Sequence, residues 1–218
     1  MGSFKERLEG ARFRYINEKL YKMESKEAVK YFRENPGDFE KYHHGFGTQV
    51  AQWPINPVDL IIDLIKQRPS LATIADLGCG KAKLKNTLGE GRLVHAYDLV
   101  ENTELGVEAA DMCKVPLADS SVDAAVFSLS LMNTNYGQAL AEARRILKPG
   151  GVVYIAEVES RMANGPESFV RELEAMGFAL RRMDISHRVF TLFEFILNDK
   201  SNHLILNNAL SPCLYKKR

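Results

Sequence analysis

Hydrophobic residues follow two different rhythms along this chain. Apolar positions recur at helical spacing within residues 4–21, 25–32, 58–66, 136–147 and 167–176, with Ser25 expected to cap the second of these helices. Between them stand short apolar runs typical of strands, at residues 73–77, 93–97, 122–127 and 152–156. Strands that alternate with helices predict a doubly wound α/β fold, built on a mostly parallel sheet with right-handed crossovers.

The ends of the chain depart from this alternation. Residues 180–183 and 189–195 are expected to pair as a hairpin, which together with a short third strand ending at Ala110-Asp111 would complete a seven-stranded sheet. Near the other end, Pro36 and Gly37 interrupt the second helix, and residues 42–47 are aromatic, punctuated by two glycines and without a period. We therefore expect a loop at 42–47, within an N-terminal helical segment of residues 1–56, followed by the sheet domain at residues 57–218.

Composition narrows the class of protein. The chain has 218 residues, of which 45% are hydrophobic and 26% charged, so a wholly disordered chain is excluded. The longest apolar stretch, residues 58–65, is interrupted by two aspartates, while a membrane-spanning helix needs about 20 apolar residues. We expect a soluble protein without a signal peptide, because charged residues follow the first four positions at once. Its three cysteines form no CxxC pair, and its histidines lack ligand spacing, so neither disulfides nor a metal site are expected.

Charge is unevenly distributed along the chain although the net value is only +1. Residues 1–50 carry +2, residues 51–159 carry −4 and residues 160–218 carry +3. This pattern is compatible with a small cationic ligand at the centre and an anionic partner at the flanks, and equally with ordinary surface variation.

The strand at residues 73–77 runs directly into a glycine turn, Asp76-Leu77-Gly78-Cys79-Gly80. In a doubly wound sheet such a turn lies where ligands bind, and Gly78 and Gly80 allow the backbone to approach a ligand closely. The third glycine of a dinucleotide fingerprint and the Gly-Lys-Ser/Thr of a phosphate loop are both missing.

Acidic residues at the next two strand ends extend this candidate site. Asp98 stands 22 residues after Asp76, a spacing that suits a carboxylate accepting hydrogen bonds from both hydroxyls of a ribose. Asp111 is placed to accept from the exocyclic amine of adenine, while Met112 packs on the ring. Any one of these acids alone would be read as a surface residue, but the three together indicate a nucleoside site.

Taken together, residues 76–151 resemble a class I S-adenosylmethionine-dependent methyltransferase with its Rossmann-like sheet. Further segments resemble the ribosomal-RNA-processing methyltransferases, the nucleomethylin-like family: EGARFRYINE at 9–18, YHHGF at 42–46, WP at 53–54, FSLSLM at 127–132 and PCLYK at 212–216. The resemblance implies an enzyme that methylates N1 of an adenine in large-subunit ribosomal RNA and takes part in rRNA processing in the nucleus and nucleolus. It also implies that His43 and Ser128 contact S-adenosylmethionine, or S-adenosylhomocysteine as product, with the loop at 42–47 capping the cofactor.

Two other functions remain open on the sequence. One is a weakly or non-catalytic S-adenosylmethionine-binding module in a nucleolar chromatin-silencing or ribosome-assembly complex, with nucleolar chromatin or pre-ribosome proteins as partners. The other is a small-molecule methyltransferase that shares only the cofactor domain. Neither a membrane nor a metal is expected as a partner in any of these cases.

Catalytic residues are the least determined part of the site. Attack by N1 of adenine on a sulfonium methyl group needs positioning and electrostatics and no covalent intermediate. Glu157 and Asn133, which follow the fifth and fourth strands, are candidates for contact with the base, and both are equally compatible with structural roles. The aromatic residues Phe13, Tyr15, Phe46 and Trp53 could receive an unstacked base, although core packing is the commoner role.

Overall fold

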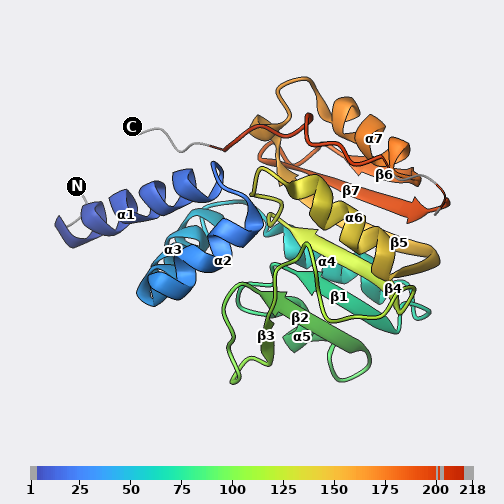
Figure 1. The fold of residues 1–218 in the computed structure, drawn as a ribbon, viewed down its shortest axis with the longest axis horizontal. Helices are drawn as coiled ribbons and strands as arrows, with labels where there is room; N and C mark the ends of the chain where they lie inside the picture. The colour runs from blue at the N-terminus through green and yellow to red at the C-terminus, as the bar shows by residue number, and fades with distance from the viewer. Residues whose placement is uncertain (1–3, 200, 202–203, 214–218) are drawn as a thin grey trace.

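A seven-stranded sheet forms the centre of the protein in the computed structural model, which describes residues 4–199, 201 and 204–213 (Figure 1). The strand order is β3-β2-β1-β4-β5-β7-β6, and every neighbouring pair is parallel except those that involve β7. The strands are β1 (Thr73–Leu77), β2 (Leu93–Asp98), β3 (Val107–Ala109), β4 (Val122–Ser128), β5 (Leu147–Val158), β6 (Phe178–Asp184) and β7 (Phe190–Leu197). The doubly wound, mostly parallel sheet and its antiparallel hairpin are therefore confirmed.

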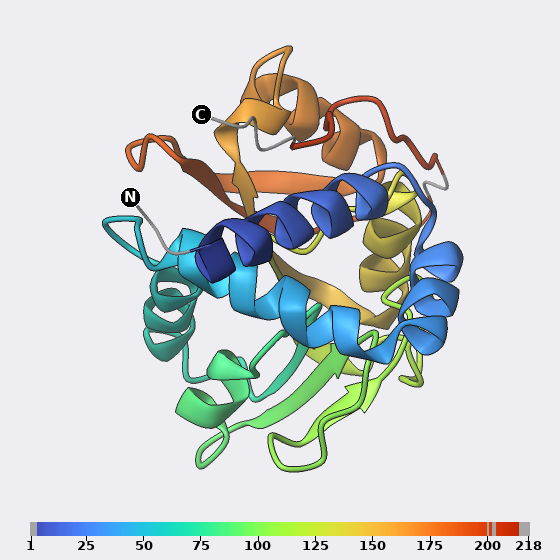
Figure 2. The ribbon, with the colours of Figure 1, turned by 90° about the vertical axis from the view of Figure 1, so that its left-hand side faces the viewer.

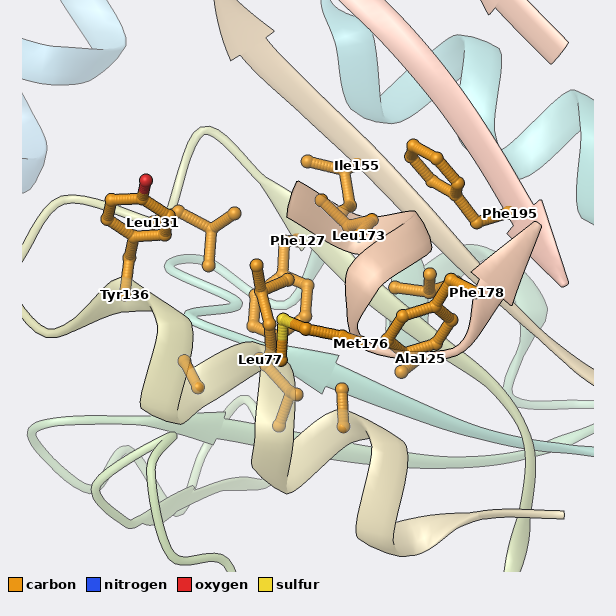
Figure 3. Packing of buried hydrophobic residues seen from close by; sticks show 14 of the residues in the cluster. Leu77, Ala125, Phe127, Leu131, Tyr136, Ile155, Leu173, Met176, Phe178 and Phe195 are labelled. Atoms are coloured by element: carbon orange, nitrogen blue, oxygen red, sulfur yellow. The ribbon is translucent and has the colours of Figure 1, made fainter. Parts of the chain in front are cut away.

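Helices cover both faces of the sheet. They are α4 (Pro57–Lys66) and α5 (Lys83–Leu88) on one face, and α6 (Tyr136–Ile146) and α7 (Pro166–Ala175) on the other. Successive residues of the strands alternate between these layers: Val126 packs with the α4 side and Phe127 with the α6 side. Figure 3 shows the second layer, where Leu77, Phe127 and Ile155 from the sheet meet Leu173 and Met176. No helix in the described part of the chain is long and apolar enough to cross a membrane.

Three N-terminal helices, α1 (Phe4–Leu20), α2 (Ser25–Glu34) and α3 (Pro36–Val50), lie at one end of the sheet, and α1 and α3 run alongside each other (Figures 1 and 2). They share a small apolar core of their own, in which Phe13, Ile16, Phe32 and Tyr42 are buried. This core continues into the sheet domain through Leu99, Val100 and Met132.

The predicted loop at residues 42–47 is wrong, because these residues lie inside α3. Pro36, which breaks α2, stands in the first turn of α3, where its missing N–H costs nothing. Gly45 is needed for packing and makes no turn: a Cβ at this position would lie 2.6 Å from the Phe13 side chain of α1. The glycine therefore marks a close crossing of two helices.

The last described segment, residues 204–213, has no regular structure and runs over the outside of α6 and α7. Its backbone is held by side chains of the domain, since the Tyr136 hydroxyl accepts from the N–H of Ala209 at 3.0 Å. At its end the Cys213 carbonyl accepts from Asn17 Nδ2 of α1 at 2.9 Å, and Cys213 is buried. This hydrogen bond connects the C-terminal segment to α1. Residues 214–216 of the PCLYK motif lie outside the described residues.

Candidate functional site

A cavity of about 580 Å³ opens at the carboxyl ends of β1, β2 and β4, beneath α3. This is where the strand order reverses between β1 and β4, the usual ligand position in a doubly wound sheet. The cavity brings together most residues that the sequence selected: His43, Asp76, Gly78, Gly80, Asp98, Met112, Ser128 and Asn133. Asp111 and Glu157 do not line it.

The glycine turn after β1 is fixed by backbone hydrogen bonds to β2. The N–H groups of Gly78 and Cys79 both donate to the Tyr97 carbonyl, at 2.9 and 3.0 Å. Gly78 has φ +79°, and a Cβ there would lie 2.4 Å from the Cβ of Ser130. A side chain at Gly78 is therefore excluded both by backbone conformation and by space.

Two carboxylates face each other across this turn and differ in their partners. Asp98 accepts the N–H of Gly80 and the N–H of Leu99, each at 2.7 Å. Asp76 is 3% exposed, and within the described residues no hydrogen bond reaches its carboxylate. Burial, and secondarily the charge of Asp98, raise the pKa of Asp76 to about 7. The floor of the cavity therefore favours a ligand that brings positive charge.

His43 lies on α3 and covers the cavity on the side of that helix. Its ring packs edge-on against Phe39 at 4.3 Å between centroids and lies close to Gly80, where a Cβ would be 3.4 Å from the imidazole. Burial lowers the pKa of His43 and outweighs the opposing effect of Asp98, while Lys81 lowers it further. The imidazole is thus neutral at pH 7.

Asp111 and Met112 follow β3 but face different surroundings. Met112 lines the cavity, while the Asp111 carboxylate accepts from the Ser25 hydroxyl and from the Cys113 N–H, both at 2.9 Å. Ser25 was predicted to cap α2, but Glu24 stands at the cap and Ser25 is the first helical residue. Sequence reasoning gave no signal that Ser25 reaches Asp111 after β3, because the two residues are 86 positions apart.

Of the two catalytic candidates, Asn133 lies in the turn after β4, and Glu157 lies near the end of β5 and contacts that turn. Asn133 lines the cavity, and its Nδ2 donates to the carbonyls of Leu20 and Met23, at 3.1 and 3.3 Å. Glu157 is 1% exposed, accepts from the Leu131 N–H at 3.1 Å and forms an ion pair with Arg161 at 2.8 Å. These contacts give Glu157 a structural role, in which it fixes the backbone of the turn.

The part of the cavity away from the glycine turn is apolar. It is lined by Phe46, Val50, Trp53, Pro54 and Leu129. The Trp53 ring stacks on Phe190 with 6.0 Å between centroids and an interplanar angle of 20°, so its orientation is fixed from behind. Of the other aromatic candidates, Phe13 is buried in the N-terminal core and Tyr15 is half exposed on α1. Among the described residues, no cluster of His, Cys, Asp and Glu could hold a metal ion.

Comparison with known proteins adds sequence relatives along the whole chain. The family described as “Hypothetical methyltransferase” matches residues 2–218. The chain is 45% identical to a 25S rRNA (adenine(645)-N(1))-methyltransferase of Schizosaccharomyces pombe, over 98% of this chain and 71% of that protein. It is 42% identical to ribosomal RNA-processing protein 8 of Dictyostelium discoideum and 41% identical to that of Mus musculus. Each match covers 98% of this chain but only 58% and 47% of the relative, so this chain spans about half the length of those two proteins.

A solved structure shares the fold. It is a 1,6-didemethyltoxoflavin-N1-methyltransferase from Burkholderia thailandensis with bound 1,6-didemethyltoxoflavin and S-adenosylhomocysteine. The TM-score is 0.60 at 19% sequence identity, over 78% of this chain and 90% of the other. This likeness supports the Rossmann-like sheet and carries no information on the substrate.

Proposed function

This chain belongs to the hypothetical methyltransferase family, and from that premise we propose that it is an S-adenosylmethionine-dependent enzyme that methylates N1 of an adenine in large-subunit ribosomal RNA. The observation that carries the proposal is the floor of the cavity: a buried carboxylate without a hydrogen-bond donor, beside a glycine turn that leaves room for a ligand. S-adenosylmethionine fits these residues, because its amino and sulfonium groups are both cationic.

We assign the cofactor contacts to residues that line the cavity and to Asp111, which stands next to the lining residue Met112. Asp76 would neutralise the amino group, the glycine turn would accommodate the methionine portion, and Asp98 would accept from the ribose hydroxyls. Asp111 and Met112 would receive the adenine, Ser128 would lie beside the cofactor, and His43 would cover it from α3. When bound, the cofactor supplies an electrophilic methyl group.

The apolar half of the cavity suits the methyl acceptor. A base must leave its stack to reach an enclosed site, and an aromatic wall such as Trp53 compensates for the lost stacking. N1 of adenine attacks through a lone pair in the plane of the ring, so the protein must hold that plane in line with the methyl group. We assign no proton-transfer residue to this step.

Electrostatics would favour the product, a base that becomes cationic on methylation. The carboxylates of Asp76 and Asp98 lie in the same cavity, and a neutral His43 adds no repulsion. Asn133 lines the cavity with its amide nitrogen engaged elsewhere, which leaves its oxygen as an acceptor toward the site. Among the candidate residues, we therefore favour Asn133 over Glu157 for contact with the base.

The ribosomal RNA substrate rests on the names of the relatives and on the resemblance carried by the terminal segments. With it we propose a nuclear, nucleolar location and pre-ribosomal or nucleolar chromatin proteins as further partners. Two N-terminal cations are held by ion pairs within the chain: Arg12 of α1 with Asp38, and Lys22, which follows α1, with Glu18. We therefore expect only a modest salt dependence of RNA binding from this chain.

The test is methyl transfer to transcribed segments of large-subunit rRNA, followed by mapping of reverse-transcription stops. N1-methyladenine cannot pair, so the wild-type protein with cofactor should give one new stop beside an adenine. The Asp98→Ala variant should give none. Binding of S-adenosylhomocysteine without methyl transfer to any RNA would instead support the non-catalytic binding module, and transfer to a small molecule alone would refute the RNA substrate.

A further inference from the structure

A buried serine of the N-terminal helices reaches the loop that follows β3. Ser25, the first residue of α2, is 1% exposed, and its hydroxyl lies 2.9 Å from Asp111 Oδ2. Among the described residues, the only other acceptor near this hydroxyl is Cys113 Sγ at 3.3 Å, and sulfur accepts hydrogen bonds weakly. The hydroxyl proton therefore goes to the Asp111 carboxylate.

Asn135, at the N-cap of α6, fixes the direction of this hydrogen bond. Its Oδ1 accepts the Ser25 N–H at 2.9 Å, which sets the orientation of the amide. Its Nδ2 then donates to Ser25 Oγ and to Gln138 Oε1, both at 3.0 Å. Because Ser25 Oγ accepts from Asn135, its own proton points away from that amide and is donated to Asp111.

The Asp111 carboxylate is held at both of its oxygens. Oδ2 accepts from Ser25, and Oδ1 accepts from the Cys113 N–H at 2.9 Å. A carboxylate oxygen can accept a second hydrogen bond, so this arrangement sets the orientation of Asp111 without using up its capacity. Met112, the next residue, lines the cavity, so a ring that packs on Met112 brings its edge toward Asp111.

We propose that Ser25 is a positioning residue for recognition of the cofactor's adenine: it orients the Asp111 carboxylate toward the exocyclic amine. The inference rests on the proposed function, because it takes S-adenosylmethionine as the ligand. It gives the N-terminal helices a direct part in cofactor selectivity, in addition to covering the cavity. Asn135 supports Ser25 in this role by fixing the direction of its hydroxyl.

The experiment measures two ligands by calorimetry: S-adenosylhomocysteine and S-inosylhomocysteine, in which a carbonyl oxygen replaces the exocyclic amine. Wild-type protein should prefer the amine ligand, because the carbonyl oxygen would face a carboxylate. Ser25→Ala should reduce that preference about fivefold to tenfold, the net value of one ordinary hydrogen bond, and should leave the affinity for the inosine ligand nearly unchanged. In an Asp111→Ala background the Ser25→Ala change should have no further effect on the preference.

Ser186→Ala is the matched control. This exposed serine also donates to an aspartate, Asp184 Oδ1 at 2.7 Å, and neither residue lines the cavity. It should leave both affinities unchanged. If Ser25→Ala does not fold, Ser25→Thr, which keeps the hydroxyl, should keep the preference, and Ser25→Cys, with a weak thiol donor, should lower it. Equal weakening of both ligands, with their ratio unchanged, would overturn the positioning role and leave only a structural one. Failure of the wild-type protein to bind either ligand would refute the proposed cofactor itself.

Discussion

The ionised carboxylate of Asp76 should favour cofactor binding but lower the free energy of unfolding, because it is buried. Burial, and secondarily the charge of Asp98, raise the pKa of the Asp76 carboxyl group to about 7, and no donor among the described residues reaches it. The folded protein therefore holds a proton there that the unfolded chain releases near pH 4. We expect Asp76→Asn, which removes this titration and keeps the shape of the side chain, to flatten the pH dependence of stability.

The size of the effect follows from the two pKa values. Because the folded pKa is raised, the stabilising proton is fully bound below the unfolded pKa and is lost as the pH rises through the folded one. The difference between 3.8 and about 7 is worth roughly 4 kcal/mol in total, at about 1.4 kcal/mol for each factor of ten. Between about pH 5 and pH 8, wild-type protein should therefore lose about 3 kcal/mol more of its unfolding free energy than Asp76→Asn.

Urea denaturation of both proteins at these two pH values measures the difference directly, since all other titrating groups are shared. The free energies of unfolding of the two proteins should converge below about pH 4, separate progressively between about pH 4 and pH 7, and differ by a constant amount above that. Calorimetry then measures cofactor binding and the protons released with it. At about pH 6, binding of S-adenosylmethionine should release close to one proton from wild-type protein and none from Asp76→Asn, because a cationic amino group favours the ionised carboxylate.

Parallel pH profiles of the two proteins would refute this reasoning, because they would mean that Asp76 is already ionised in the folded protein. Proton release that persists in Asp76→Asn would place the titrating group elsewhere in the cavity. Unchanged cofactor affinity in Asp76→Asn at pH 8 would remove Asp76 from the ammonium site, whatever its effect on stability.

Three further substitutions test other parts of the site. Gly78→Ala should abolish cofactor binding and lower the free energy of unfolding by more than about 2 kcal/mol. Gly150→Ala is its control, because Gly150 has a similar φ of +75° but a Cβ there would meet nothing within 4 Å, so only the backbone strain of about 1–2 kcal/mol is expected. Equal losses in urea titrations would contradict the close contact of Gly78 with Ser130. Asp98→Ala should bring cofactor affinity below detection by calorimetry, because it removes a charged acceptor worth about 1.5–3 kcal/mol per bond, and unchanged affinity would exclude the ribose contact. Arg161→Met should destabilise the fold by about 3–5 kcal/mol, because Glu157 is left buried without its partner, and adding Glu157→Gln should recover part of this loss in chemical denaturation.

The sheet and the glycine turn could be predicted because their signals are local. Each central strand is a short apolar run bounded by polar residues, and Gly78 and Gly80 of the ligand-binding turn both have positive φ, which favours glycine. The spacing of Asp98 after Asp76 follows from one β-α-β unit, so it also lies within reach of sequence reasoning.

Helix α3 could not be predicted for the opposite reason. Glycines and the aromatic run at residues 42–47 are typical of a loop, and their helical conformation comes from packing on α1 and on the sheet domain. Gly45 is the clearest case, because its role depends on Phe13, which is 32 positions earlier in the sequence. This matters for the site, because His43 lies on this helix between Phe39 and Tyr42. Ring contacts with these two residues hold the imidazole over Gly80.

Glu157 and Asn133 show why a strand-end position does not by itself define a catalytic role. Asn133 follows β4 and Glu157 lies near the carboxyl end of β5, where catalytic residues of such sheets lie, and the sequence treats them alike. The structure separates them by what occupies the side chain: Arg161 and the Leu131 N–H take both oxygens of Glu157, while Asn133 lines the cavity and uses its amide nitrogen for the carbonyls of Leu20 and Met23. Arg161 is itself completed by the carbonyl of Ser211, which accepts from its Nε at 2.9 Å. The C-terminal segment thus helps to fix the turn after β4, an effect that no motif near Glu157 could reveal.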